Sequence, residues 1–458
     1  MPQYGTGGGR IVAPFKKGPD YIDAAWLSSA AARPCRNLDL FMHTPDVIVN
    51  SFHQTSRSAD VAVIEGNRGL FDGMDRAGTC STAELAKLLQ APVILVVDCT
   101  KVTRTVSAMV LGCQTLDPEV AIRGIVLNRI AGPRHRQVLE GSILDVCGIP
   151  VVGAVPRLPE DSFPERHLGL VPPPEHAGEE DSLGRAAAMA EEYLDLDTIW
   201  SIALDAPSLE GSGAGQAERV DAVPGVDPGD RVTLPVRIGI FRDAAFQFYY
   251  PENLEALASQ GADLVEISPV SDREIPAVDA LYLGGGFPET LAPALAGNEP
   301  FKDALRKQVE AGLPVYAECG GAVYLGRTLH YEGNTYPMAG VLPVDFSFST
   351  RPRGHGYVEL ETVSENPFFE QGETLRGHEF HYTGVEGASY NELSFAFRVL
   401  RGHGFGEERD GLCFRNVLAS YTHLHALGSK SWAPGVVQAA VRHRSIMKEL
   451  ADTDTGKG

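Results

Sequence analysis

The chain has 458 residues, of which 43% are hydrophobic and 22% are charged. This length predicts about two to four domains, and the apolar content excludes a mainly disordered chain because it is enough for at least two cores. The formal net charge of −21 argues against nucleic acid or an anionic membrane surface as a partner. No apolar run reaches the roughly 20 residues that span a bilayer, and residues 1–10 lack the apolar core of a signal peptide.

The seven cysteines are scattered along the chain without CxxC pairs. This distribution is typical of a cytoplasmic protein with reduced thiols, and it does not indicate a disulfide framework. The pairs His378/His381 and His423/His425 have spacings that suit zinc, but no further Cys or His cluster completes a ligand set.

The first half of the chain alternates apolar segments with helical stretches. The apolar segments cover residues 60–65, 92–98, 122–128 and 150–155. They have no polar alternation, which is typical of parallel strands covered on both faces. Helices are expected between them, for instance over 81–89 and 105–115. This β-α-β-α order predicts an open, doubly wound α/β sheet.

A second α/β pattern follows a stretch rich in Gly, Pro, Ser and acidic residues. Such a stretch cannot form a core, so residues 205–234 are predicted to be an interdomain linker. Strands are expected after it at 236–241, 264–267, 280–283 and 314–318, with shorter ones at 356–361 and 397–400. The expected organisation is an N-terminal domain over 1–204, the linker over 205–234, a C-terminal domain over 235–446 and a tail over 447–458.

The most informative local pattern places a cysteine between a strand and a helix. An apolar segment ends at Cys319, and Gly320 and Gly321 follow it. A sharp strand-to-helix turn puts a nucleophile in a strained backbone conformation, and small neighbours make room for it. The start of the following helix would lower the pKa of the thiol. A buried structural cysteine before a glycine-rich turn is the alternative.

Three consecutive glycines, Gly284, Gly285 and Gly286, follow another predicted strand. Glycines let backbone N–H groups turn toward a ligand, as an oxyanion hole requires. A thiol nucleophile also needs a base. The candidate bases are four late histidines: His378, His381, His423 and His425.

Several longer motifs occur in both halves of the chain. The first half contains PFKKGPDYID at 14–23, RNLD at 36–39, EGNRGLFDG at 65–73 and PERHLGL at 164–170. The second half contains RDAAFQFYYPEN at 242–253, GGGFPE at 284–289, ECGG at 318–321, RGHEFHY at 376–382 and YTHLH at 421–425. Together they resemble class I glutamine amidotransferases and, more narrowly, the cobyrinate a,c-diamide synthase family. The resemblance covers nearly the whole chain and implies a dethiobiotin-synthetase-like P-loop-type domain followed by a flavodoxin-like class I glutaminase domain.

The resemblance implies roles in the second half. Cys319 would be the nucleophile that forms a thioester with glutamine, and His423 would be its base. The glutaminases of this branch are Cys-His pairs that lack the usual Glu two residues after the His, where this chain has His425. The amides of the 284–286 loop, together with that of Gly320, would hold the oxyanion.

Acidic residues of the first half stand in loops or at a strand end, where sites on open α/β sheets gather. They are Asp20, Asp23, Glu65 and Asp72. Their oxygens suit Mg²⁺, although solubilising loop charge is the alternative. The resemblance makes the first three candidates for the Mg²⁺–ATP site, with Asp20 and Glu65 as metal ligands. Asp72 becomes a candidate for the substrate carboxylate.

Three further residues would serve the nucleotide. Lys16 or Lys17 would neutralise phosphate charge, and Asn128, at the end of its strand, would contact the nucleotide base.

The chain departs from the family at its start. Family members open with a strand, a GxxxxGK[ST]T phosphate-binding loop and a helix, whereas residues 1–10 read MPQYGTGGGR. A strand, loop and helix would add about 25–30 residues. Either the true start lies upstream, where in-frame DNA would encode an apolar strand and GxxxxGKT, or the loop is lost and ATP-driven synthesis with it.

The resemblance implies glutamine- and ATP-dependent amidation of the a and c acetate groups of a tetrapyrrole such as cobyrinate, in cobalamin biosynthesis. Four arginines, Arg33, Arg36, Arg68 and Arg76, could attract this anionic substrate. The pair Asn67-Arg68 also admits sirohaem or sirohydrochlorin as the substrate. A glutaminase without synthetase activity and a tetrapyrrole-binding protein are the alternatives, and a homodimer is a further expectation.

Overall fold

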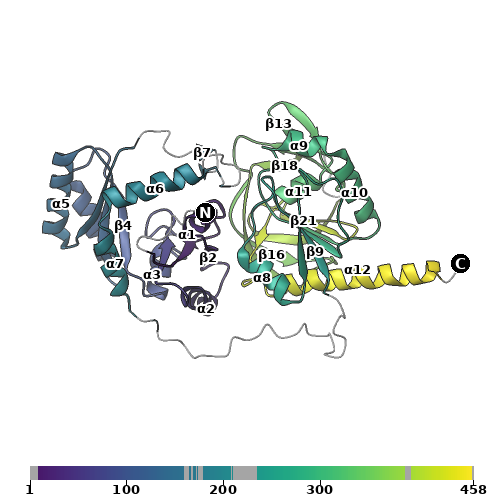
Figure 1. Ribbon diagram of the computed structural model, residues 1–458, viewed down its shortest axis with the longest axis horizontal. Coiled ribbons are helices and arrows are strands. Elements are labelled where there is room, and N and C mark those ends of the chain that lie inside the picture. Colours follow the sequence, from purple (N-terminus) through teal and green to yellow (C-terminus); the bar gives the residue numbers. More distant parts are fainter. Residues whose placement is uncertain are drawn as a thin grey trace. The chain divides into compact units, whose positions relative to one another are not determined.

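The computed structural model describes residues 9–158, 165–166, 169–171, 173, 179–207, 209, 235–386 and 393–455. The chain divides into two compact units, Met1–Gly215 and Gln216–Gly458 (Figure 1). The expected linker lies outside the described residues, apart from 205–207 and 209, and so do residues 164, 167 and 168 of the 164–170 motif.

The first unit contains two parallel three-stranded sheets, ordered β2-β1-β3 and β4-β5-β6. Their strands are β1 (Val12–Lys17), β2 (Arg36–Leu38), β3 (Val61–Glu65), β4 (Val93–Asp98), β5 (Ile122–Ile130) and β6 (Val151–Pro156). A short antiparallel pair consists of β7 (Glu165–Arg166) and β8 (Gly169–Leu170). The predicted strands are confirmed, but the described residues form two sheets where the sequence predicted one open sheet.

Helices connect these strands. They are α1 (Ile22–Ala31), α2 (Pro45–Ser56), α3 (Thr82–Leu88), α4 (Thr105–Leu116), α5 (Pro133–Cys147), α6 (Glu179–Tyr193) and α7 (Leu196–Leu204). The side chain of Ser81 accepts a hydrogen bond from the Glu84 amide and so caps α3. Ala83 belongs to the core of the β4-β5-β6 sheet, whereas Leu85 belongs to that of the β2-β1-β3 sheet. Helix α3 therefore joins the two cores.

Strands β3 and β4 are edge strands, and each exposes an apolar side chain. Val63 on β3 is 49% exposed, and Val96 on β4 is 61% exposed. The sequence predicted strands covered on both faces, and that prediction is wrong for these two. An edge strand presents unpaired backbone groups, so each of these edges is a place where another strand can pair.

The second unit is built on one ten-stranded sheet, ordered β10-β9-β11-β12-β21-β20-β19-β16-β17-β22. The parallel strands are β9 (Arg237–Phe241), β10 (Asp263–Ile267), β11 (Ala280–Leu283), β12 (Val315–Glu318) and β21 (Val417–Ser420). The antiparallel strands are β16 (Gly354–Thr362), β17 (Thr374–His381), β19 (Ser394–Arg401), β20 (Arg409–Phe414) and β22 (His423–Leu424). The predicted strands of this half are confirmed.

Helices cover both faces of this sheet. They are α8 (Pro251–Ser259), α9 (Ala292–Gly297), α10 (Glu299–Glu310), α11 (Gly320–Leu325) and α12 (Trp432–Thr455). Alternate residues of β12 point to opposite faces: Ala317 packs in a core with Phe301 of α10, and Tyr316 packs in a core with Trp432 of α12. Figure 1 shows α12 running along the sheet beside α8.

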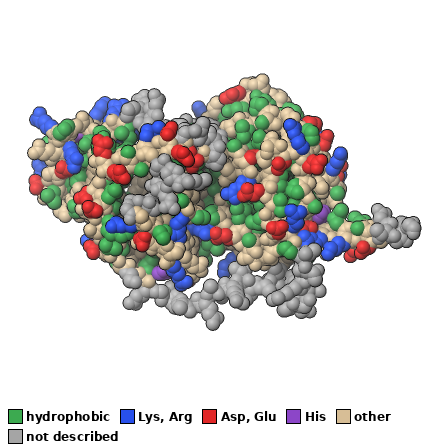
Figure 2. All heavy atoms as spheres, viewed as in Figure 1, with side chains coloured by type: hydrophobic (Ala, Val, Ile, Leu, Met, Phe, Trp, Pro, Cys, Tyr) green, Lys and Arg blue, Asp and Glu red, His purple; other side chains and the backbone are tan. Residues whose placement is uncertain are grey.

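A small second sheet completes this unit, ordered β14-β13-β15-β18. Its strands are β13 (Thr328–Tyr331), β14 (Asn334–Pro337), β15 (Asp345–Phe348) and β18 (Thr383–Glu386). Acidic and basic side chains are interspersed over the face of each unit that Figure 2 shows. Within the described residues, no helix combines the length and apolar composition needed to cross a membrane.

A buried aspartate fixes the segment between β21 and β22. The carboxylate of Asp410 accepts hydrogen bonds from the hydroxyls of Ser420 (2.8 Å) and Thr422 (2.7 Å). It also accepts the backbone amides of Tyr421 (3.0 Å) and Thr422 (3.2 Å). One side chain of β20 therefore holds the three residues that precede His423.

Replacing Asp410 with alanine should destabilise the protein strongly, because several buried donors lose their acceptor together. We expect Asp410→Ala to lower the free energy of unfolding by about 3 kcal/mol or more, measured by urea denaturation. The matched control is Asp263→Ala, an exposed aspartate of β10, which should change it by less than about 0.5 kcal/mol. Equal effects of the two substitutions would contradict the assigned role of Asp410.

Candidate active sites

Cys319 lies on a strained turn between β12 and α11. Its backbone angles, φ +45° and ψ −101°, fall outside the regions that non-glycine residues ordinarily adopt. A Cβ atom on Gly321 would lie 2.6 Å from the carbonyl oxygen of Leu283, so only glycine fits at that position. The predicted strand–turn–helix geometry is therefore confirmed, and close backbone approach explains one of the glycines after the cysteine.

The cysteine turn, the triple-glycine loop and His423 come together. A Cβ atom on Gly320 would lie 3.0 Å from the backbone nitrogen of Gly286. One on Gly285 would lie 2.5 Å from Cε1 of His423. The loop thus lies against the residue after Cys319 on one side and against the imidazole on the other.

The amide of Gly284 has a different partner. It donates to the Tyr249 hydroxyl at 2.8 Å, and that hydroxyl donates to the carbonyl oxygen of Phe241 at the end of β9. This pair of bonds ties the start of the loop to the neighbouring strand. Within the loop, Gly285 and Gly286 are therefore the better candidates for holding an oxyanion.

The thiol of Cys319 is buried, with 8% of the residue exposed. Burial raises the pKa of this thiol, the nearby Glu289 carboxylate raises it further, and the Gly320 amide offsets only part of the increase. The start of α11 lowers the thiol pKa as expected, but burial and the neighbouring acids outweigh this effect, so the net shift is upward. Thiolate formation at this site therefore requires a proton acceptor.

His423 is buried beside a carboxylate and a second imidazole. Its Nδ1 lies 3.4 Å from Oε2 of Glu318. The pairing of β17 with β22 sets His378 opposite His423, and the two rings stack with centroids 5.0 Å apart. Burial lowers the pKa of His378, and the charge of a protonated His423 would lower it further. His378 is therefore a neutral neighbour of the candidate base.

The other two candidate histidines have different surroundings. The ring of His425 lies 4.5 Å from that of Tyr250. The Nδ1 of His381 hydrogen bonds with the carbonyl oxygen of Thr383 at 2.8 Å. The ring of His423, by contrast, lies against the triple-glycine loop.

Glu318 was not among the predicted site residues. Its side chain is fully buried and accepts hydrogen bonds from the hydroxyls of Tyr282 and Tyr316, each at 3.2 Å. It also accepts the Leu424 amide at 3.2 Å. The signal for it was present in the sequence, because an acidic residue inside an apolar strand next to a nucleophile is unusual.

In the first unit, four of the predicted residues come together around a lysine. Lys16 Nζ lies 2.7 Å from Asp23 Oδ2 and 3.0 Å from Glu65 Oε2. The carboxylate of Asp20 accepts the Asp23 amide at 2.9 Å. The parallel pairing of β1 with β3 explains the cluster, because it brings the carboxyl ends of both strands to one edge.

Burial changes the acid–base properties of this cluster. It raises the pKa of Asp20, with Asp23 contributing, and it raises the pKa of Glu65 although Lys16 opposes the shift. Burial also lowers the pKa of Lys17. A cation placed near these carboxyl groups would stabilise their ionised form and lower their pKa.

The chemistry of this cluster bears on magnesium. Within the described parts of the chain, no three His, Cys, Asp or Glu side chains converge as a metal-binding group. Mg²⁺ is commonly held by one or two carboxylates together with nucleotide phosphates and water. The carboxylates of Asp20 and Glu65 fit that mode of binding. The described residues do not provide a metal site built from protein ligands alone.

Asp72 and Asn128 make their contacts elsewhere. The carboxylate of Asp72 accepts the Gly69 amide at 3.1 Å, within the loop after β3. The side chain of Asn128, on β5 of the other sheet, accepts the Arg129 amide at 2.9 Å. The structure does not bring either residue into the Lys16 cluster.

Asn37 has a supporting position that the sequence did not reveal. Its side-chain amide, buried at β2, donates to the carbonyl oxygens of Gly18 and Asp20, each at 2.8 Å. These bonds hold the loop that carries the acidic residues against the sheet.

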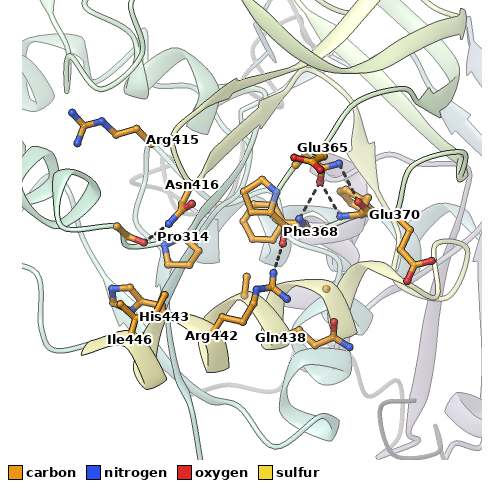
Figure 3. Close-up of a pocket in the computed structure, with 16 residues that line it drawn as sticks. Pro314, Glu365, Phe368, Glu370, Arg415, Asn416, Gln438, Arg442, His443 and Ile446 are labelled. Carbon is orange, nitrogen blue, oxygen red and sulfur yellow. Dashed lines mark hydrogen bonds between the residues drawn. The ribbon is translucent and has the colours of Figure 1, made fainter. Parts of the chain in front are cut away.

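A pocket of about 700 Å³ lies at the amino ends of β12 and β21 in the second unit's sheet (Figure 3). Its lining includes Pro314 and Asn416, which precede β12 and β21, whereas Cys319 follows β12. The pocket is therefore separated from the thiol by the length of these strands, and it is not the site of thiol chemistry.

We expect native Cys319 to react slowly with iodoacetamide near neutral pH, because burial raises its pKa and the thiolate is the reactive form. Peptide mass spectrometry should show a labelling rate that keeps rising with pH beyond the range of an ordinary thiol. The control is the same protein in denaturant, where Cys319 should react like a model thiol. Rapid labelling of the native protein below neutral pH would contradict this expectation.

Comparisons with known proteins cover both units. Residues 237–431 match the CobB/CobQ-like glutamine amidotransferase domain, and residues 27–165 match an AAA domain. A cobyrinate a,c-diamide synthase of Magnetococcus marinus is 41% identical over 93% of this chain and 90% of its own length. Those of Archaeoglobus fulgidus and Methanothermobacter thermautotrophicus are each 38% identical, over 95% and 94% of this chain and 92% and 94% of their own lengths. Because this similarity extends through both units, the chain belongs to the cobyrinate a,c-diamide synthase family.

Proposed function

We propose that this protein uses glutamine and ATP to amidate the a and c acetate groups of cobyrinate in cobalamin biosynthesis. The observation that carries the proposal is the similarity, over nearly the whole chain, to relatives named cobyrinate a,c-diamide synthase. These names favour cobyrinate over sirohaem or sirohydrochlorin. The meeting of Cys319, the triple-glycine loop and His423 supports the glutamine-dependent half of the reaction.

In the second unit, the thiol of Cys319 transfers its proton to His423, and the resulting thiolate attacks the carboxamide carbon of glutamine. Amides of Gly285, Gly286 and Gly320 hold the oxyanion that develops. The C–N bond breaks as His423 returns the proton to the leaving ammonia. Water then hydrolyses the thioester and releases glutamate and the thiol.

In the first unit, the γ-phosphoryl group of ATP is transferred to a substrate carboxylate. Ammonia attacks the acyl phosphate, and inorganic phosphate leaves. Lys16 offsets the charge of the phosphates, while Asp20 and Glu65 would hold Mg²⁺. The metal, when bound, supplies positive charge that reduces the repulsion between the anionic reactants. Asp72 and Asn128 are proposed to contact the substrate carboxylate and the nucleotide base.

A single substitution should separate the amidation reaction from glutamine hydrolysis. We expect Cys319→Ala to abolish glutaminase activity and glutamine-dependent amidation but to keep ATP-dependent amidation with an ammonium salt, because only the ammonia source is lost. Each amidation removes one negative charge, so anion-exchange chromatography with mass spectrometry resolves the products stepwise. The matched control is Cys413→Ala, a cysteine of β20 in the same unit, which should keep both activities. Glutaminase activity that survives Cys319→Ala would contradict the proposal.

We also propose that one further parallel strand, followed by a phosphate-binding loop and a helix, belongs between β3 and β4. The exposed side chains of Val63 and Val96 support this, because the added elements would cover them. Helix α3 already packs against both cores, which supports a single continuous sheet. The loop would follow the carboxyl end of the new strand, at the edge where β3 ends with Glu65.

The DNA sequence upstream of Met1 tests this proposal. We expect it to encode, in frame, an apolar strand followed by GxxxxGKT. The extended protein should bind ATP more tightly than the 458-residue chain in equilibrium dialysis and should unfold at a higher temperature. A stop codon directly upstream of Met1, or an extension that changes neither property, would overturn it.

A further inference from the structure

We propose that Glu318 is a positioning residue of the glutaminase site: it holds His423 with the Nδ1 proton toward Glu318, so that Nε2 accepts the proton of Cys319. This inference rests on the proposed glutamine hydrolysis. It supplies a carboxylate to a pair that the family resemblance describes as lacking one.

The two ring nitrogens of His423 have different neighbours. Nδ1 lies 3.4 Å from Oε2 of Glu318. A Cβ atom on Gly285 would lie 2.5 Å from Cε1 and 3.3 Å from Nε2, so the opposite edge of the ring lies at the glycine loop. One ring nitrogen thus faces the buried acid, and the other lies near the glycine loop, the candidate oxyanion site.

The hydrogen bonds of Glu318 favour a proton on Nδ1 of His423. Oε1 accepts the Tyr316 hydroxyl and the Leu424 amide, each at 3.2 Å. Oε2 accepts the Tyr282 hydroxyl at 3.2 Å and faces His423 Nδ1. An ionised carboxylate only accepts hydrogen bonds, so it favours the imidazole tautomer with the proton on Nδ1.

A second set of bonds keeps these donors in place. Asn253 donates to the Tyr282 hydroxyl (3.3 Å) and to the Leu424 carbonyl oxygen (2.9 Å). Since the Tyr282 hydroxyl accepts from Asn253, its own proton is directed to Glu318. Burial raises the pKa of Tyr282 and of Tyr316, so both hydroxyls keep their protons. The Glu318 carboxylate is therefore held rigidly beside the imidazole.

Two residues after His423, where other class I glutaminases carry a Glu, this chain has His425, which makes different contacts. His425 accepts the Leu427 amide at its Nδ1 (3.2 Å), and its Nε2 lies 3.6 Å from Oε2 of Glu252. This second buried carboxylate faces a different histidine. Glu318 is the carboxylate that the described residues place next to His423.

The first test measures the tautomer of His423 in the wild-type protein, so it does not depend on a substitution at Glu318. Long-range ¹⁵N–¹H NMR of the full chain labelled at its 13 histidines reports which ring nitrogen carries the proton. The His423 signal is assigned by its loss in His423→Asn. We expect the Nδ1–H tautomer in the wild-type protein at neutral pH. An Nε2–H tautomer would overturn the proposal.

The second test is the kinetics of glutamine hydrolysis. Glu318→Gln should lower kcat roughly 100- to 1,000-fold while KM for glutamine changes little, because the base loses its tautomer preference but the binding groups stay. Glu318→Asp keeps the charge on a shorter side chain and should recover part of the lost kcat. The matched control is Glu252→Gln, the other buried carboxylate beside a histidine, which should stay within a few-fold of wild type.

The outcomes separate this inference from the proposed function. If wild type hydrolyses glutamine through Cys319 and folded Glu318→Gln does so at the same rate, the role of Glu318 is wrong and the glutaminase assignment stands. If wild type shows no Cys319-dependent hydrolysis, the proposed function itself fails. If Glu318→Gln does not fold, the wild-type tautomer still decides.

Discussion

Close backbone contact at one turn is the constraint on which the second unit depends. Cys319 adopts a strained positive φ, and the residues after it lie against the end of β11 and the glycine loop. A side chain at Gly321 would collide with the Leu283 carbonyl oxygen. Strain of this kind persists only where the surrounding structure enforces it, and here two packed cores and a ten-stranded sheet do so.

Both units place their candidate chemistry by the same device. In parallel sheets the carboxyl ends of neighbouring strands meet at one edge, so residues distant in sequence become neighbours. β1 and β3 bring Lys16 to Glu65 in the first unit, and β11 and β12 bring the glycine loop to Cys319 in the second. The antiparallel strands β17 and β22 add His378 and His423 from the opposite half of the sheet.

Much of this arrangement could be predicted from the sequence. Runs of Val and Ile without polar alternation located the parallel strands, and the pattern strand–Cys–Gly–Gly located the turn. The pKa of Cys319 could not be predicted, because it depends on burial by segments as distant as Phe380. The exposure of β3 and β4 could not be predicted either, since a run of apolar residues does not show which strand lies at the edge of a sheet.

Long-range hydrogen bonds explain why other residues were missed. The role proposed for Glu318 became visible only when β22 brought His423 beside it, and that of Asn37 only when β2 paired with β1. Glu318 ends an apolar strand next to a candidate nucleophile, but this pattern does not identify its partner, and Asn37 has no unusual neighbour pattern. Polar residues at the ends of buried strands are therefore worth inspection whenever an adjacent residue is a candidate nucleophile.

The adjacency of Glu318 and Cys319 has a mechanical consequence. One peptide bond joins the residue whose carboxylate lies beside the imidazole to the residue whose sulfur that imidazole is proposed to serve, so a displacement of the turn shifts both groups together. The alignment of the three groups therefore depends on how closely β22 lies to the end of β12, and β22 is held in the sheet by its pairing with β17.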